Sequence, residues 1–189
     1  MKVAPRGGLP HEVRIIGGQW KRSKLPVADK PGLRPTPDRV RETLFNWLGQ
    51  DLSGWRCLDA FAGSGALGFE ALSRGAARVV MVEPASKVIA ALHENAKMLE
   101  NPPGMEIIRG DALQYLASTK SKFDLIFLDP PFDKGWIPRL EPLLAGVANE
   151  GAAVYIEAEH EIGALGNWRA VRHGKAGEVH FQLMRRETG

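Results

Sequence analysis

The chain has 189 residues, of which 44% are hydrophobic and 25% charged, a composition typical of one soluble globular domain. It contains no apolar run that could cross a bilayer, residues 1–14 lack the apolar segment of a secretory signal, and a lone Cys57 excludes an internal disulfide, so we expect a cytoplasmic protein. Residues 1–49 hold ten basic and four acidic side chains, whereas the rest of the chain holds fifteen and eighteen. This asymmetry indicates either a basic arm that binds a polyanion or a solvated tail.

The first thirty residues predict a small hairpin. Residues 1–10 are rich in Gly and Pro and are expected to lack regular structure. Residues 13–27 predict two short strands, with the turn either at Gly17-Gly18 or near residues 21–23. Because residues 1–30 carry little of the apolar pattern of a main sheet, we expect that their deletion leaves a folded core.

A helix is predicted over residues 36–48, after a link that contains Pro and Gly. Thr36 is expected to cap this helix, Pro37 suits its first position, and Gly49 suits its C-terminal cap. Apolar residues at helical spacing predict one buried face, which consists of Val40, Leu44, Trp47 and Leu48.

From residue 55 onward the pattern alternates between strands and helices. Strands are predicted at residues 55–61, 78–83, 106–109, 123–129 and 152–157, with helices at 66–75, from Pro84, through Leu113 and Leu116, and near 136–145. The chain ends with a predicted hairpin, in which 174–177 join strands at 168–173 and 178–186. Nearly continuous apolar strands indicate a parallel sheet covered on both faces.

This pattern resembles the α/β, Rossmann-like fold of S-adenosylmethionine-dependent methyltransferases. We expect a mostly parallel seven-stranded sheet with an antiparallel C-terminal hairpin and a small N-terminal β-hairpin extension. The expected units are a basic N-terminal extension at residues 1–33 and a methyltransferase domain at 34–189.

A glycine-rich turn follows the first strand of the main sheet. Residues 63–68 match G-x-G-x-x-G, in which glycines allow a tight turn and a close approach of backbone N–H groups to a ligand. Glu83 ends the next strand, where its carboxylate can accept hydrogen bonds from both hydroxyls of a ribose. NAD and S-adenosylmethionine both contain that ribose, so these residues leave both cofactors open.

Two further carboxylates favour S-adenosylmethionine. Asp59 precedes the glycine turn, where it suits the positive amino group of a methionine moiety and would repel a pyrophosphate. Asp111 ends the third strand and can accept from the adenine amino group, although an Asp before a helix is also an ordinary cap. The predicted cofactor-binding residues are Asp59, Phe61, Gly63, Gly65, Glu83, Pro84, Asp111 and Ala112.

The segment Asp129-Pro130-Pro131-Phe132 closes the fourth strand and indicates the methyl acceptor. The lone pair of an exocyclic base amine is delocalised into the ring, so the amine is a poor nucleophile. The Asp129 carboxylate and the Pro130 carbonyl can each accept one N–H of that amine, and Phe132 can stack on a base removed from its helix. We predict Asp129, Pro130, Pro131 and Phe132 as the catalytic group, without a metal.

The chain resembles the RsmD family of 16S ribosomal RNA guanine-N2 methyltransferases over nearly its whole length. The resembling stretches are RIIGGQWKRSKLPV, RPTPDRVRETLFNWL, LDAFAGSGALGFEALSRGA, VEP, GDA, DPPF and AGEVHFQLMRR. The resemblance implies methylation of guanine N2 in small-subunit RNA, within an assembling subunit. By the same resemblance, Asp59, Gly63, Gly65, Glu83 and Asp111 bind the cofactor and 129–132 receive the base.

The basic arm completes the predicted site. The residues expected to bind RNA are Arg14, Trp20, Lys21, Arg22, Lys24, Arg34 and Arg39. For Trp20 a small core remains the alternative. Arg34, Arg39 and Arg41 are interpreted either as contacts to RNA phosphate, or as contacts to cofactor and base, or as a solvated face. We expect a monomer without membrane contact. Adenine-N6 methylation of nucleic acid, glutamine-N5 methylation of protein and a non-catalytic RNA-binding assembly factor stay open as alternatives.

Overall fold

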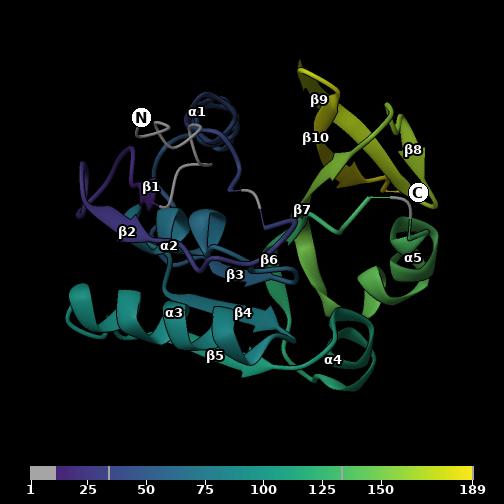
Figure 1. Ribbon diagram of the computed structural model, residues 1–189. Coiled ribbons are helices and arrows are strands. Elements are labelled where there is room, and N and C mark those ends of the chain that lie inside the picture. The colour runs from purple at the N-terminus through teal and green to yellow at the C-terminus, as the bar shows by residue number, and fades with distance from the viewer. Residues whose placement is uncertain (1–11, 34, 133, 189) are drawn as a thin grey trace, which may run out of the picture.

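One large sheet, covered by helices on both faces, forms the body of the computed structural model, which describes residues 12–33, 35–132 and 134–188 (Figure 1). The strands are β1 (Glu12–Arg14), β2 (Lys24–Pro26), β3 (Arg56–Asp59), β4 (Arg78–Glu83), β5 (Met105–Arg109), β6 (Phe123–Leu128), β7 (Ala148–Ala158), β8 (Ala164–Leu165), β9 (Trp168–Ala176) and β10 (Val179–Arg186). The helices are α1 (Asp38–Leu48), α2 (Ala66–Ser73), α3 (Ser86–Met98), α4 (Ala112–Ser118) and α5 (Trp136–Val147). The predicted α/β architecture is confirmed.

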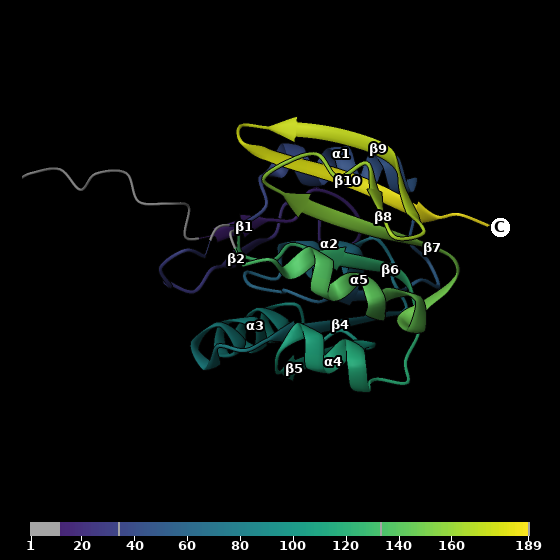
Figure 2. The same cartoon turned by 90° about the vertical axis from the view of Figure 1, so that its right-hand side faces the viewer.

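Within the described residues the main sheet has eight strands in the order β5-β4-β3-β6-β7-β10-β9-β8. The strands from β5 to β7 are parallel, and β10 pairs with both β7 and β9 in antiparallel orientation, so β9 and β10 form a long hairpin (Figure 2). The expected number of seven strands is wrong, because the two-residue β8 also pairs with β9. The predicted turn at residues 174–177 is also too long, since pairing continues through Ala176 and Val179.

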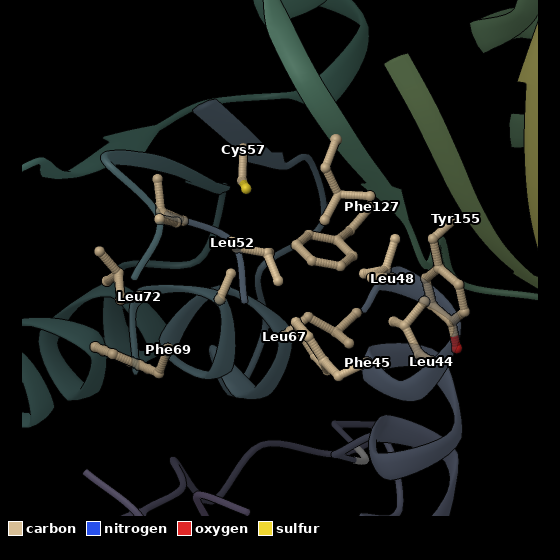
Figure 3. Close-up of a cluster of buried hydrophobic side chains, with 14 of the residues drawn as sticks. Leu44, Phe45, Leu48, Leu52, Cys57, Leu67, Phe69, Leu72, Phe127 and Tyr155 are labelled. Atoms are coloured by element: carbon tan, nitrogen blue, oxygen red, sulfur yellow. The ribbon is translucent and has the colours of Figure 1, made fainter. Parts of the chain in front are cut away.

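The strands of the main sheet bury both faces because their side chains alternate between two apolar clusters. Cys57, Met81 and Phe127 pack toward α1, α2 and α3, whereas the intervening positions of the same strands pack toward α4 and α5. On the first face the Phe127 ring contacts the rings of Phe45 and Tyr155, at centroid distances of 6.4 and 6.2 Å, and all three belong to the buried cluster in Figure 3. Helix α1 is therefore fixed to the strands that carry the candidate site.

The start of α1 differs from its sequence-based prediction. The helix begins at Asp38 with Pro37 as its N-cap, and no side chain caps it. The Thr36 hydroxyl instead donates to Glu157 Oε1 at 2.9 Å. The predicted Thr36 cap is therefore wrong, because the Thr36 hydroxyl donates its hydrogen bond to the buried Glu157 carboxylate and not to the backbone of the helix. Gly49 ends the helix in the left-handed conformation, as predicted.

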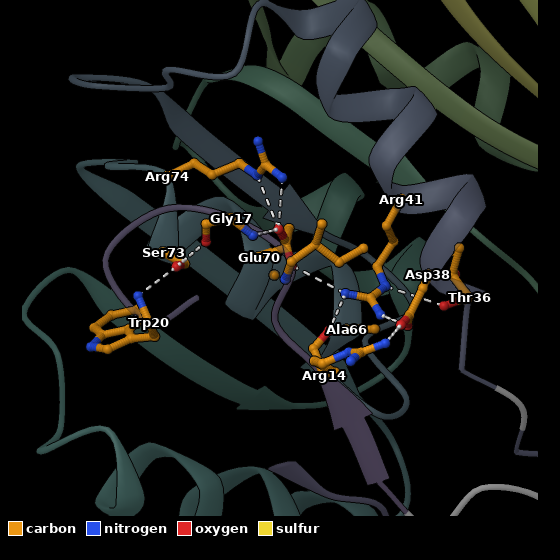
Figure 4. Close-up of polar contacts among 12 residues, drawn as sticks. Arg14, Gly17, Trp20, Thr36, Asp38, Arg41, Ala66, Glu70, Ser73 and Arg74 are labelled. Atoms are coloured by element: carbon orange, nitrogen blue, oxygen red, sulfur yellow. Dashed lines mark hydrogen bonds and ion pairs between the residues drawn. The ribbon is translucent and has the colours of Figure 1, made fainter. Parts of the chain in front are cut away.

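The predicted N-terminal hairpin is confirmed as β1 paired with β2, and the chain reverses between Ile15 and Arg22. The hairpin packs against α2 and buries Ile15 and Leu25 in the main core, and Val13 of β1 is buried as well. The backbone N–H groups of Ile16 and Gly17 donate to the Glu70 carboxylate at 3.0 Å (Figure 4). The structure therefore does not support the expectation that residues 1–30 can be removed without disturbing the core.

Candidate active site

The glycine turn between β3 and α2 has a left-handed backbone that favours glycine. Gly63 and Gly65 have positive φ angles of 52° and 81°. A Cβ atom on Gly65 would lie 2.6 Å from the Phe69 ring, and one on Gly68 would lie 2.5 Å from Met81. The first two glycines therefore shape the turn, and the third allows α2 to pack closely on the sheet.

Glu83 joins the end of β4 to this turn. Its Oε2 accepts the Gly63 N–H at 3.1 Å, and its Oε1 accepts the Ala85 N–H at 3.2 Å. The side chain is buried, and Pro84 follows it at the edge of the sheet. The carboxylate that the sequence assigned to a ribose therefore lies directly against the glycine turn.

Asp59 is buried at the end of β3, on the other side of the turn. Its Oδ2 accepts the Gly68 N–H at 3.1 Å. The pKa of Asp59 is raised to about 7, mainly by burial; the Gly68 hydrogen bond opposes this rise, and the negative charges of Glu83 and Glu157 contribute to it. A carboxyl group among negative charges suits a positively charged ligand group, which would favour its ionised form.

Asp111 lies at the end of β5 and caps α4. Its Oδ1 accepts the backbone N–H groups of Leu113 and Gln114, at 2.9 and 3.1 Å. The capping alternative from the sequence is thus confirmed, and both of these bonds use the same oxygen. Ala112, the first residue of α4, is buried.

The segment from Asp129 to Phe132 follows β6 at the same edge of the sheet. Asp129 is half-buried and Pro130 is buried, whereas Pro131 is exposed and the Phe132 side chain is 40% exposed. Of the described residues only Met98, Phe132 and Val171 are large exposed hydrophobics. An exposed aromatic ring beside a half-buried carboxyl is an arrangement that can hold a flat base.

A second carboxyl, Glu157, lies beside Asp129, and the sequence interpretation missed it. The two carboxyls are hydrogen-bonded to each other, and the Tyr155 hydroxyl donates to Glu157 Oε1 at 2.7 Å. Burial raises the pKa of Asp129 well above its usual value, and the Glu157 charge raises it further. Burial also raises the pKa of Glu157. Its position at the carboxyl end of β7 is the signal that could have identified it.

Trp136 is another residue of this region that the sequence interpretation missed. Its ring packs edge-on against Phe61 at a centroid distance of 5.2 Å, and the Arg139 guanidinium lies 5.1 Å from the Trp136 ring centroid. Within the described part of the chain, its buried Nε1 has no hydrogen-bond partner. Phe61, a predicted cofactor residue, is therefore supported by the first turn of α5.

The predicted RNA-binding residues fall into several environments. The side chains of Lys21, Arg22, Lys24 and Arg39 are exposed, whereas Arg34 lies outside the described residues. Arg14 is exposed and pairs with Asp38 at 3.3 Å. Trp20 is half-buried against the main core, which favours the small-core alternative over a stacking role.

The structure contradicts the RNA contact and the solvated face that the sequence offered for Arg41. Its side chain is 1% exposed, so it neither contacts RNA nor forms a solvated face. Its Nη1 pairs with Glu70 Oε2 at 3.1 Å, and its Nη2 pairs with Asp38 at 2.6 Å (Figure 4). Arg41 therefore joins α1 to α2 and belongs to the interior.

Known proteins are similar to this chain in sequence and in architecture. The family model described as conserved hypothetical protein 95 matches residues 13–185. The ribosomal RNA small subunit methyltransferase D of Escherichia coli strain K12 is 44% identical over 182 residues, which cover 94% of this chain and 91% of the relative. The protein of the same name from Haemophilus influenzae is 40% identical and covers 97% of this chain and 98% of the relative.

A solved structure agrees with these relatives. The structure of yhhF from Escherichia coli superposes with a TM-score of 0.83 at 42% identity and covers 94% of this chain and 99% of that one. The family resemblance inferred from the N-terminal, glycine-turn and DPPF stretches is therefore confirmed. The chain belongs to the RsmD family of methyltransferases.

Proposed function

We propose that this protein transfers the methyl group of S-adenosylmethionine to the exocyclic N2 of a guanine in 16S ribosomal RNA. Membership of the RsmD family and the printed names of its relatives support small-subunit ribosomal RNA as the substrate. The observation that carries the proposal is the arrangement of residues 129–132, where a half-buried carboxyl, a buried proline and an exposed aromatic ring lie at the carboxyl end of β6.

The residues around the glycine turn fit S-adenosylmethionine. The buried Asp59 carboxyl lies among negative charges and suits the amino group of the methionine moiety, while Glu83 suits the ribose hydroxyls. Asp111 suits the adenine amino group through the oxygen that its two capping bonds do not use. When bound, S-adenosylmethionine supplies a methyl group on a positively charged sulfur. The protein contributes the turn that holds it against the sheet.

The DPPF segment prepares the guanine amine for attack. The Asp129 carboxyl and the Pro130 carbonyl accept the two amine N–H groups, which directs the nitrogen lone pair toward the methyl group. Phe132 stacks on the base, and the two prolines keep the turn rigid. With S-adenosylmethionine bound, the methyl carbon would pass from sulfur, which keeps the bonding pair, to the amine nitrogen that Asp129 and Pro130 hold, and the methylated nitrogen would then lose one proton to water.

A comparison of substrates tests this proposal. We expect the purified protein to methylate unmodified small-subunit ribosomal RNA, either free or in an assembling particle, but neither DNA nor a release-factor protein. Methylation of DNA or of a glutamine amide instead would support the adenine-N6 or glutamine-N5 alternative. Cofactor binding without transfer to any substrate would support the alternative of a non-catalytic RNA-binding assembly factor.

We also propose that the protein acts as a monomer in the cytoplasm, where ribosomes assemble.

Phe132 gives a test of base stacking. Replacement with Tyr or Trp retains a flat ring and should retain transfer, whereas Phe132→Ala should weaken base binding by about 1–3 kcal/mol. Single-turnover transfer rates at a range of RNA concentrations measure this difference. Val171→Ala removes a comparably exposed hydrophobic side chain on β9 and serves as the control. If Phe132→Ala transfers methyl groups at the parent rate over the whole range of RNA concentrations, the Phe132 ring does not stack on the base and serves only in packing.

Two exposed cations of the N-terminal hairpin give a test of the RNA interface. Changing both Lys21 and Arg22 to Ala should weaken RNA binding and reduce its dependence on salt concentration, because fewer counterions are released from the phosphates. Filter binding at several salt concentrations measures the slope. The matched control changes Lys120 and Lys122, which are exposed before β6 at the opposite end of the strand from Asp129. Equal slopes for the two double variants would exclude the hairpin from the interface.

A further inference from the structure

Glu157 occupies the position next to Asp129 on the neighbouring strand. Strands β6 and β7 run parallel, and their last paired residues are Leu128 and Ile156. Asp129 and Glu157 each follow directly, so the backbone brings both carboxyl groups to the same edge of the sheet. Glu157 is buried, whereas Asp129 is half-buried and reaches the candidate site.

Two hydroxyl groups fix the Glu157 carboxyl from different parts of the chain. Tyr155 donates to Glu157 Oε1 at 2.7 Å, and Thr36 donates to the same oxygen at 2.9 Å. Both donors are buried. Thr36 precedes Glu157 by 121 residues and lies in the segment that leads into α1. A side chain held in this way has one orientation, and that orientation is directed at Asp129.

The contact between the two carboxyls requires a shared proton. Two ionised carboxylates cannot hydrogen bond to each other, and they repel when buried together. The Asp129 and Glu157 side chains are hydrogen-bonded, so the pair carries one proton between them. The titratable and polar groups that act on this pair are Asp59 at the end of β3, Tyr155 on β7 and Thr36 before α1.

We propose that Glu157 is the positioning residue for Asp129, which it holds through a shared proton so that one Asp129 oxygen stays directed at the amine of the substrate. The proposal rests on the proposed function, because it needs Asp129 to accept an amine N–H. In this arrangement the side chain of Asp129 loses its rotational freedom before the base arrives. Glu157 itself contacts neither the base nor the cofactor.

Removing the Glu157 carboxyl should slow transfer without weakening binding. In Glu157→Ala we expect kcat to fall about 100-fold, because a small displacement of a reacting group costs that much, while the KM for RNA and the Kd for S-adenosylmethionine stay near the parent values. Glu157→Gln should recover most of this loss, since its amide can donate to Asp129 permanently. A purely structural role for Glu157 would change binding and rate together.

The pH profile distinguishes the shared proton from simple packing. As pH rises through the elevated pKa of Asp129, the parent pair loses its shared proton and the two carboxylates repel. The Gln variant has no proton to lose at this contact. The ratio of kcat for Glu157→Gln to kcat for the parent should therefore rise as the pH increases through that elevated pKa. A ratio that stays constant at every pH at which both proteins remain folded contradicts the proposal.

Two further variants complete the test. Tyr155→Phe removes one hydrogen-bond donor to Glu157 with little change of volume. It should lower kcat several-fold and leave cofactor binding unchanged. This variant tests the positioning role of Glu157 if Glu157→Ala fails to fold. Glu150→Gln removes an exposed carboxylate at the other end of β7 and should match the parent. If Asp129→Ala is inactive while all Glu157 and Tyr155 variants match the parent, the positioning role fails and the proposed function stands. If Asp129→Ala is fully active, the proposed function fails.

Discussion

Asp129→Ala is expected to lower methyl transfer by about 10³-fold or more while leaving the affinity for S-adenosylmethionine unchanged. The Asp129 carboxyl is proposed to accept a hydrogen bond from the amine, whereas the cofactor is proposed to lie against Gly63 and Glu83 on neighbouring strands. Single-turnover kinetics and calorimetric binding measure the two quantities separately. Asp129→Asn keeps one acceptor oxygen and should retain part of the activity.

The matched change on the cofactor side is Glu83→Ala. Loss of charge-assisted hydrogen bonds to the ribose should cost about 1.5–3 kcal/mol of binding free energy, which raises the cofactor Kd about 10-fold or more. Glu83 also accepts the N–H groups of Gly63 and Ala85, so this change loosens the turn as well. If the Asp129 and Glu83 variants lose cofactor affinity equally, the proposed division between the two residues is wrong.

Of the substitutions proposed for this protein, Glu70→Ala is expected to lower the free energy of unfolding most. The Glu70 side chain is fully buried and pairs with Arg41 at 3.1 Å and with Arg74 at 3.0 Å, while it also accepts two N–H groups from the N-terminal hairpin (Figure 4). Its removal leaves two buried guanidinium groups without their shared partner. Breaking a buried ion pair in this way costs about 3–5 kcal/mol of unfolding free energy.

Urea unfolding followed by circular dichroism measures this loss. Glu70→Gln keeps an acceptor oxygen and should lose less stability than Glu70→Ala. The control is Glu94→Ala, which removes an exposed ion pair with Lys97 on α3 and should change stability little. An unfolding free energy for Glu70→Ala close to that of the Glu94 variant would show that the buried network contributes little.

Local patterns explain why the sequence predicted so much of this fold. Nearly continuous apolar strands indicate burial on both faces, and the parallel strands place their carboxyl ends at one edge. Asp59, Glu83 and Asp129 each end or directly follow a strand, so their gathering at that edge follows from the fold alone. Glycines that form a tight turn are equally visible, since their backbone requirement is local.

Contacts between distant segments account for what the sequence did not predict. Thr36 precedes a helix and has the chemistry of a cap, yet its hydroxyl donates to Glu157, which lies 121 residues away. Arg41 lies in a basic segment that is typical of a nucleic-acid surface, yet Glu70 holds it in the interior. The two-residue β8 has too few residues for any periodicity. In each case the partner, not the local pattern, decides the structure.

Identification of the methylated nucleoside tests the central claim most directly. Unmodified small-subunit ribosomal RNA is incubated with the protein and isotopically labelled S-adenosylmethionine, digested to nucleosides and separated by chromatography with mass detection. We predict that the label appears in N2-methylguanosine and that Asp129→Ala gives none. Label in N6-methyladenosine, or in no nucleoside while the protein binds the cofactor, would contradict the account.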